Sequence, residues 1–141
     1  MKSNSFTVGA DLVRGPQRYL NDVLSQGNGT NLLEGIVMAG TFLEHYGKDK
    51  LEKYYISKQV PTKPLNIKQM FVGKVYYYLH AFGLIDDPFF KDFTEFIAVR
   101  NDVVHNLDYP DSVLFAGKMN AAQLRDAIEK AKRCLVKMGA P

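Results

Sequence analysis

The most regular feature of this sequence is the spacing of its apolar residues, which recur at intervals of three and four along most of the chain. Such spacing places side chains on one face of an α-helix. No stretch shows the apolar–polar alternation that is typical of a half-buried β-strand, so the pattern predicts an all-α chain. The clearest example lies near the C-terminus and has the spacing of a bundle seam: Leu124, Ile128, Ala131, Leu135 and Met138.

Residues that start or break helices divide the first third of this pattern. Pro16 suits the first turn of a short helix that we expect to extend to about Ser25. Asn31, followed three residues later by Glu34, has the form of a capping box and predicts the start of a second helix. We expect Gly47 to end this second helix, because glycine commonly follows the last helical residue.

The middle of the chain is expected to be less regular. Residues 48–58 are charged and rich in tyrosine and are expected to add at most one or two helical turns. Pro61 and Pro64 then indicate a connector. Asn66 is expected to cap a third helix that extends through Phe82 and is closed by the next glycine.

Two further helices are predicted in the C-terminal part. The pair Asp87-Pro88 combines a capping residue with a proline at the first helical position, and the helix is expected to reach about residue 106. Asn120 is expected to cap the last helix, and Gly139 is expected to stop it.

Four longer helices with short or medium connections predict an antiparallel four-helix bundle, in which the helix at residues 16–25 is an accessory. We expect residues 1–141 to form a single domain, because the length suits one core and no repeat or long linker divides it. Hydrophobic residues make up 46% and charged residues 23%, which is ordinary for a globular chain.

The expected location is cytoplasmic. The longest apolar run, at residues 35–43, is far shorter than the roughly 20 residues that a membrane span needs. The first residues lack the pattern of a secretory signal. The single cysteine, Cys134, excludes an intramolecular disulfide and a multi-cysteine metal site. A net charge of +3 permits an anionic partner without requiring one.

The candidate chemistry lies in the segment Arg100-Asn-Asp-Val-Val-His105, called here the RNDVVH motif. Four polar residues occupy six positions of a helix that is otherwise aromatic and aliphatic, and burying unpaired polar groups is costly. The motif is therefore expected at a solvent-facing helix end, in a polar cleft or at an interface. Arg100 and His105 are five positions apart, about 140° around an ideal helix, whereas Asn101 and His105 share a face.

An arginine and a histidine without metal ligands nearby suit cleavage of a phosphodiester. Histidine exchanges protons near neutral pH, and arginine can bind phosphate oxygens through two hydrogen bonds. Two copies of the helix that meet across a two-fold axis would bring both residue types into one composite cleft. The simpler alternative is a histidine at a helix end beside an arginine that faces solvent.

The RNDVVH motif resembles the signature of the HEPN family, in which an arginine and a following polar residue precede a histidine by a short interval. This resemblance implies a homodimeric, metal-independent and cofactor-free endoribonuclease that cleaves RNA by 2′-hydroxyl attack, commonly a toxin or phage-defence component. It implies that Arg100 and His105 are catalytic and that Asn101 supports them.

The motif departs from one part of the family in its regulation. A subset that is controlled by a nucleotidyltransferase antitoxin has a tyrosine two positions after the histidine. Here that position is Leu107, and Tyr109 lies two residues further on. The resemblance therefore does not imply regulation by tyrosine modification, and a cognate antitoxin protein of another kind stays compatible with it.

A second function class also fits the sequence. HEPN-like members that have lost catalysis bind a partner protein or a nucleotide. A surplus of aromatic residues expected at the surface favours this alternative, namely Tyr54, Tyr55, Tyr76 and Tyr77. A plain helical structural protein is the third alternative.

Overall fold

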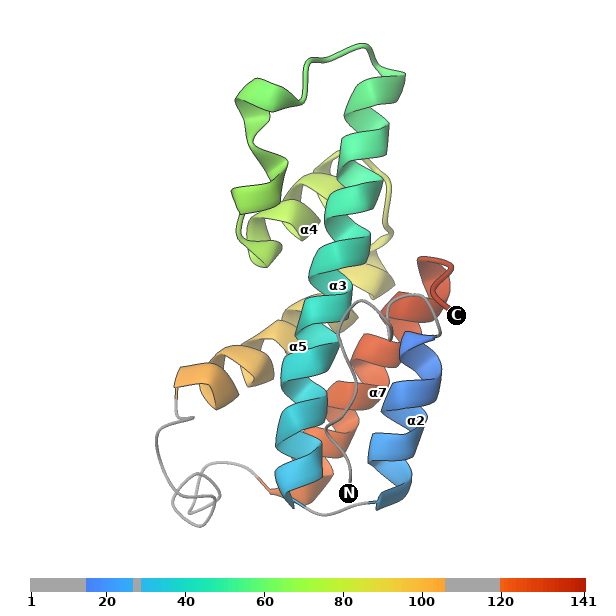
Figure 1. The fold of residues 1–141 in the computed structure, drawn as a ribbon, viewed down its shortest axis with the longest axis vertical. Coiled ribbons are helices and arrows are strands. Elements are labelled where there is room, and N and C mark those ends of the chain that lie inside the picture. Colours follow the sequence, from blue (N-terminus) through green and yellow to red (C-terminus); the bar gives the residue numbers. More distant parts are fainter. Residues whose placement is uncertain (1–14, 27–28, 106–119) are drawn as a thin grey trace.

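The computed structural model describes residues 15–26, 29–105 and 120–141, and helices account for most of these ranges (Figure 1). No strand occurs within them, so the all-helical class is confirmed. The helices are α2 (Pro16–Gln26), α3 (Gly29–Ser57), α4 (Val72–Ala81), α5 (Asp87–His105) and α7 (Ala121–Lys137), with single 3-10 turns η1 (Lys63–Leu65) and η2 (Ile67–Gln69).

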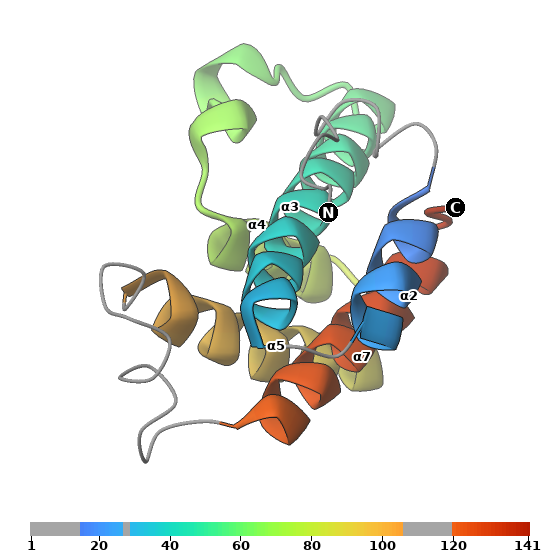
Figure 2. The same cartoon turned by 60° about the horizontal axis from the view of Figure 1, so that its bottom comes forward.

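Helix α3 is the central helix of the fold, because α2, α4, α5 and α7 all contact it. Helices α2, α3 and α7 lie side by side, and α4 and α5 run across α3 (Figures 1 and 2). The expected set of four antiparallel helices therefore stays a prediction. Among the described residues, no helix is long and apolar enough to cross a bilayer.

The expectation that Gly47 ends the second helix is wrong. Helix α3 continues for ten residues beyond it, to Ser57. The reason is a packing contact: a Cβ at position 47 would lie 2.6 Å from Cε2 of Tyr76. The glycine thus makes room for a ring instead of terminating a helix, and Leu51, in the extension, is fully buried.

Three of the expected capping residues, Asn31, Asn66 and Asp87, do not cap their helices. Asn31 lies inside α3, which already begins at Gly29, so it does not cap that helix. Helix α4 begins at Val72, and Asn66 instead lies between the two 3-10 turns with a left-handed backbone, at φ 52°. In α5 the capping carboxylate is Asp86, which accepts a hydrogen bond from the backbone N–H of Phe89 at 2.9 Å.

Three expected ends are confirmed. Asn120 and Gln123 form a reciprocal capping box, each side chain accepting a backbone N–H of the other at 2.9 Å. Gly83 and Gly139 follow α4 and α7 with φ values of 74° and 80°, which favour glycine. The helix at residues 16–25 is confirmed as α2, one residue longer than expected.

The core lies around α3, between this helix and α2, α4, α5 and α7. Its largest fully buried side chain is Tyr76, whose hydroxyl donates a hydrogen bond to the carbonyl of Leu43 at 2.7 Å. The ring of Tyr76 stacks on Phe93 with centroids 4.1 Å apart. Other fully buried members of the core are Leu20, Leu32, Ile36, Phe42, Leu43, Phe96, Leu124 and Ile128.

Candidate functional site

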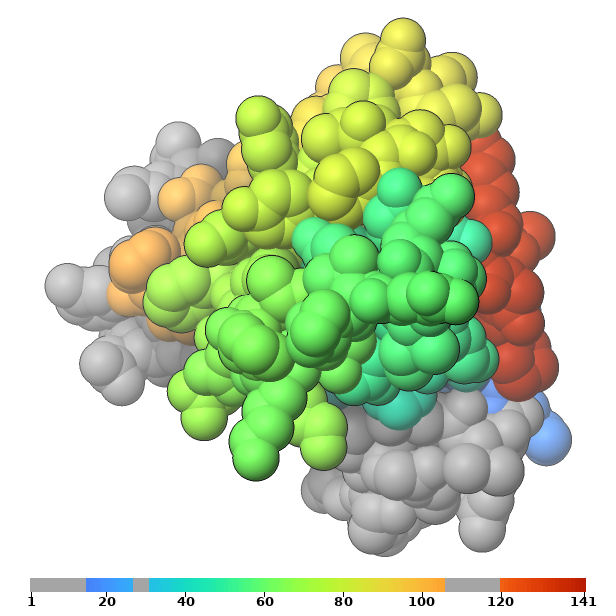
Figure 3. Space-filling view, turned by 90° about the horizontal axis from the view of Figure 1, so that it is seen from above, coloured from blue at the N-terminus to red at the C-terminus, as the bar shows by residue number. Residues whose placement is uncertain are grey.

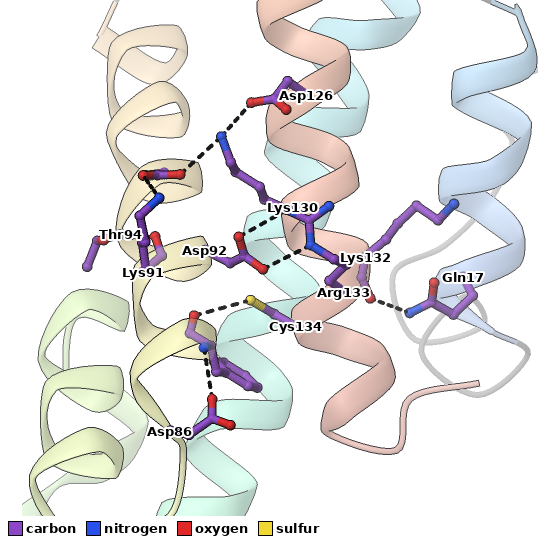
Figure 4. Close-up of polar contacts among 12 residues, drawn as sticks. Gln17, Asp86, Lys91, Asp92, Thr94, Asp126, Lys130, Lys132, Arg133 and Cys134 are labelled. Carbon is purple, nitrogen blue, oxygen red and sulfur yellow. Dashed lines mark hydrogen bonds and ion pairs between the residues drawn. The ribbon is translucent and has the colours of Figure 1, made fainter.

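Helix α5 carries the RNDVVH motif on its last two turns, and α7 holds this helix in place. Arg133 of α7 donates from Nε and from its terminal nitrogen to the two carboxylate oxygens of Asp92, both at 3.0 Å (Figure 4). Glu95 pairs with Lys91 at 2.6 Å and with Lys130 of α7 at 3.1 Å. A two-pronged contact such as the one to Asp92 fixes orientation, so α7 positions the first half of α5, ahead of the motif.

These pairs also explain the role of two acidic residues of α5. The hydrogen bond from Arg133 lowers the pKa of the Asp92 carboxyl below its ordinary value. Hydrogen bonds from Lys91 and Lys130 lower the pKa of Glu95 in the same way. Both carboxylates therefore stay ionised and join two helices, and neither is placed to act as a general acid.

Arg100 has an unusual environment. It is half-buried, and its side chain lies along α3 at Gly40, where an added Cβ would be 3.1 Å from Nε and 3.3 Å from Cγ of the arginine. Its Nε is buried without a hydrogen-bond partner among the described residues. The guanidinium also donates to Oδ1 of Asn101 at 3.3 Å. Packing against a glycine thus places this arginine, at the cost of one unsatisfied donor.

The other polar residues of the motif face solvent. Asn101, Asp102 and His105 are exposed, whereas Val103 between them is fully buried. Because α5 is continuous through both positions, Arg100 and His105 lie about 140° apart around its axis. Within one chain, Arg100 contacts Asn101, whereas Arg100 and His105 do not share a face of α5. Leu107 and Tyr109, which follow the motif, lie outside the described residues.

Two titratable groups near α5 have structural roles. His80 stacks on Phe90 with centroids 4.3 Å apart, and its Nε2 lies 2.7 Å from a carboxylate oxygen of Asp87. Burial raises the pKa of the Cys134 thiol to about 12, and this thiol lies 3.8 Å from the carbonyl of Phe89. Within the described ranges, no group of three or more histidine, cysteine or acidic side chains could hold a metal ion.

The sequence did not indicate a groove that lies away from the motif. The groove has a volume of about 410 Å³, and its wall includes Lys50, Lys53, Tyr54 and Met138. These residues come from the second half of α3 and from the end of α7. No sequence pattern links positions 50 and 138, so the groove can be recognised only from the packing of α3 against α7.

No family model, curated protein or solved structure matches this chain. The functional interpretation of α5 therefore depends on the residues of the RNDVVH motif and on their geometry.

Proposed function

We propose that this chain is a metal-independent endoribonuclease that acts as a homodimer, with Arg100 and His105 as catalytic residues and Asn101 as their support. The observation that carries the proposal is the exposure of His105, together with Asn101, at the end of α5, beside the half-buried Arg100. A buried histidine with a structural role would not be available to a substrate, whereas His105 is exposed. The biological setting that we propose is a cytoplasmic toxin or phage-defence component.

The proposed reaction needs two proton transfers. The ribose 2′-oxygen loses its proton and bonds to the adjacent phosphorus, and the bond from phosphorus to the 5′-oxygen breaks. The 5′-oxygen takes up a proton, so the products carry a 2′,3′-cyclic phosphate and a 5′-hydroxyl. His105 suits both transfers because imidazole gives and accepts protons near neutral pH. The guanidinium of Arg100 suits the charge that develops on the phosphate.

The angle of about 140° between the two side chains makes a dimer part of the proposal. Two copies of α5 that meet across a two-fold axis, within the expected four-helix frame, would contribute two arginines and two histidines to one cleft. The hydrogen bond between Arg100 and Asn101 supports a role for Asn101 in orienting the arginine.

The direct test is incubation of the full chain with single-stranded RNA in EDTA. We expect cleavage with 2′,3′-cyclic phosphate ends, reduced at least about 100-fold by His105→Ala, since loss of a general acid or base has this magnitude. His45→Ala is the matched control, because His45 is an exposed histidine in the middle of α3. Equal cleavage, or equal lack of it, by folded wild type and His105→Ala would refute the proposal.

Mixing two inactive variants tests the composite cleft. A dimer of Arg100→Ala keeps two histidines and no arginine, and a dimer of His105→Ala keeps two arginines and no histidine. A mixed dimer keeps one of each, so we expect the mixture to regain activity that neither variant has alone. If mixed dimers form, as shown by mass spectrometry, and stay inactive, each protomer does not supply half of the site.

The second candidate is a non-catalytic module that binds a partner protein or a nucleotide. The expectation that four tyrosines lie at the surface is only partly met, because Tyr76 is fully buried and Tyr54 and Tyr55 are half-buried. Tyr77 remains 60% exposed, and the ring of Phe71 is 85% exposed. This candidate is favoured if the folded wild-type chain leaves RNA intact.

A further inference from the structure

The end of the molecule formed by the last turns of α3, by η1 and η2, and by α4 has an unusual charge. Residues 53–85 contain five lysines and no aspartate or glutamate, although the whole chain carries 15 acidic residues. Lys58, Lys63, Lys68 and Lys74 are all exposed. Figure 3 looks onto this end, where the segment fills most of the view. The surface therefore attracts anions more strongly than the net charge of +3 indicates.

Aromatic rings are exposed on the same segment. Phe71, directly before α4, is 85% exposed, and Tyr77, on the outer side of α4, is 60% exposed. A Cβ added at Gly73, one turn before Tyr77, would meet no atom within 4 Å. The rings thus lie at an open surface, and Lys74 places its Nζ 5.9 Å from the ring of Tyr78. We call Phe71, Tyr77, Lys63, Lys68 and Lys74 the basic aromatic face.

This face lies on the same side of α3 as the RNDVVH motif. Helices α4 and α5 form an antiparallel pair, since His80 stacks on Phe90 and Tyr76 stacks on Phe93. Positions nearer the start of α4 therefore lie toward positions nearer the end of α5. The start of α4 and the end of α5 lie on one side of α3 in both ribbon views (Figures 1 and 2). A strand bound across the start of α4 would continue toward the motif.

We propose that the basic aromatic face binds single-stranded RNA, with Phe71 and Tyr77 stacking on bases and Lys63, Lys68 and Lys74 contacting phosphates. Exposed aromatic rings among unpaired basic residues are the combination that single-stranded nucleic acids need. The inference deepens the proposed function, because it assigns the substrate-binding surface of the same enzyme.

A second copy of the chain is a poorer occupant of this face. Contact through the face across a two-fold axis would set lysines against lysines, and like charges placed against each other disfavour association. Lysine is also depleted in the cores of protein interfaces. An anionic membrane surface also has a charge complementary to the lysines. A membrane accepts any exposed apolar side chain, whereas base stacking requires a flat aromatic ring, and the two exposed apolar side chains of this face are both aromatic.

Fluorescence anisotropy with a labelled oligouridylate of about 12 nucleotides tests the rings. The full-length His105→Ala chain in EDTA serves as parent, so that binding is measured without cleavage. We expect Phe71→Ala and Phe71→Leu to weaken binding about 5- to 100-fold, and Phe71→Tyr to stay within about twofold of the parent. Val136→Ala is the matched control, because Val136 is 61% exposed on α7, outside the face.

The salt dependence of binding tests the lysines. Each phosphate contact to a single strand contributes about 0.7 to the slope of log affinity against log salt. Replacing Lys63, Lys68 and Lys74 by glutamine is therefore expected to reduce this slope by about 2. The control removes three positive charges elsewhere in the chain, with glutamine at Arg18, Arg125 and Lys137, and is expected to leave the slope unchanged.

Three results would overturn the inference: no binding of the oligouridylate by the parent, equal binding by Phe71→Leu and Phe71→Tyr, or tighter binding to vesicles with one-third phosphatidylserine than to RNA. Its failure is distinguishable from failure of the proposed function. If wild type cleaves RNA in EDTA while the face variants bind like their His105→Ala parent and, with His105 restored, cleave like wild type, the nuclease stands and the face is wrong. If RNA binds through Phe71 but is never cut, the face stands and the nuclease is wrong.

Discussion

Replacing Gly47 with alanine should destabilise the fold, although the same change in an open helix position stabilises it. The added Cβ would lie 2.6 Å from Cε2 and 2.9 Å from Cζ of Tyr76, closer than real Cβ atoms approach a ring. Tyr76 cannot move aside easily. It is fully buried, its ring stacks on Phe93, and its hydroxyl is bonded to the carbonyl of Leu43.

The size of the effect follows from three contributions. Overpacking in a filled core costs about 1–3 kcal/mol. Displacing Tyr76 weakens a buried hydrogen bond of about 1 kcal/mol. Alanine in place of glycine in a helix returns about 1 kcal/mol. The net loss in the free energy of unfolding is therefore about 2 kcal/mol, or roughly 7 °C in Tm for a chain of this length.

Urea unfolding followed by far-ultraviolet circular dichroism measures this loss. Gly73→Ala is the control, because Gly73 is an exposed residue of α4 with open space around it, and it should gain up to about 1 kcal/mol. In a Tyr76→Leu background, Gly47→Ala should cost at least about 1 kcal/mol less, since the clashing ring is gone. An unchanged or higher urea midpoint for Gly47→Ala in the wild-type background would refute the packing argument.

Three further predictions concern α5 and α7. The thiol of Cys134 is buried, and its pKa is raised to about 12. At pH 8 it should react with a disulfide reagent at least about 100-fold more slowly in the native chain than in the chain unfolded in urea. A fast reaction of the native chain would contradict its burial. Because Arg133 lowers the folded-state pKa of Asp92, Asp92→Asn should lower the free energy of unfolding by up to about 1 kcal/mol at pH 7. The difference from wild type in urea unfolding should shrink as the pH falls below about 4, and a difference that does not shrink with acidification would exclude a charge effect. Asn120→Ala should lower the unfolding free energy by about 1 kcal/mol and Asn120→Gly by only a few tenths, through loss of the capping box with Gln123; equal losses would show that the cap is not the cause.

The sequence predicts the helical class and several helix ends because these features depend on neighbours in the chain. Asn120 caps α7 through Gln123, three residues away, and Gly139 adopts a positive φ whatever surrounds it. A capping box and a left-handed glycine are local chemistry, so local patterns are enough to find them. The helix period also identifies α5 correctly, since its buried residues recur at intervals of four, three and seven positions, which keep them on one face.

The features that the sequence missed depend on residues far apart in the chain. Glycine is the residue type that commonly follows a helix, yet Gly47 is explained by its close contact with the ring of Tyr76, 29 positions later in the chain. Tyr76 looks like a surface residue beside two other tyrosines, but of the three only Tyr76 is fully buried. For the candidate site, the motif itself is visible in the sequence, while the placement of Arg100 against Gly40 requires the packing of α5 on α3.

That placement separates stability from activity in one substitution, Gly40→Ala. The new Cβ would lie 3.1 Å from Nε and 3.3 Å from Cγ of Arg100, so the arginine must shift by a few tenths of an ångström. Arg100 is half-buried and flexible, unlike Tyr76 at Gly47, so the shift should cost less than the helix propensity of alanine gains. We expect unfolding free energy to stay level or rise by up to about 1 kcal/mol, while RNA cleavage falls about tenfold because catalysis is sensitive to small displacements. A more stable variant with undiminished cleavage would mean that catalysis does not use the position in which α3 holds Arg100.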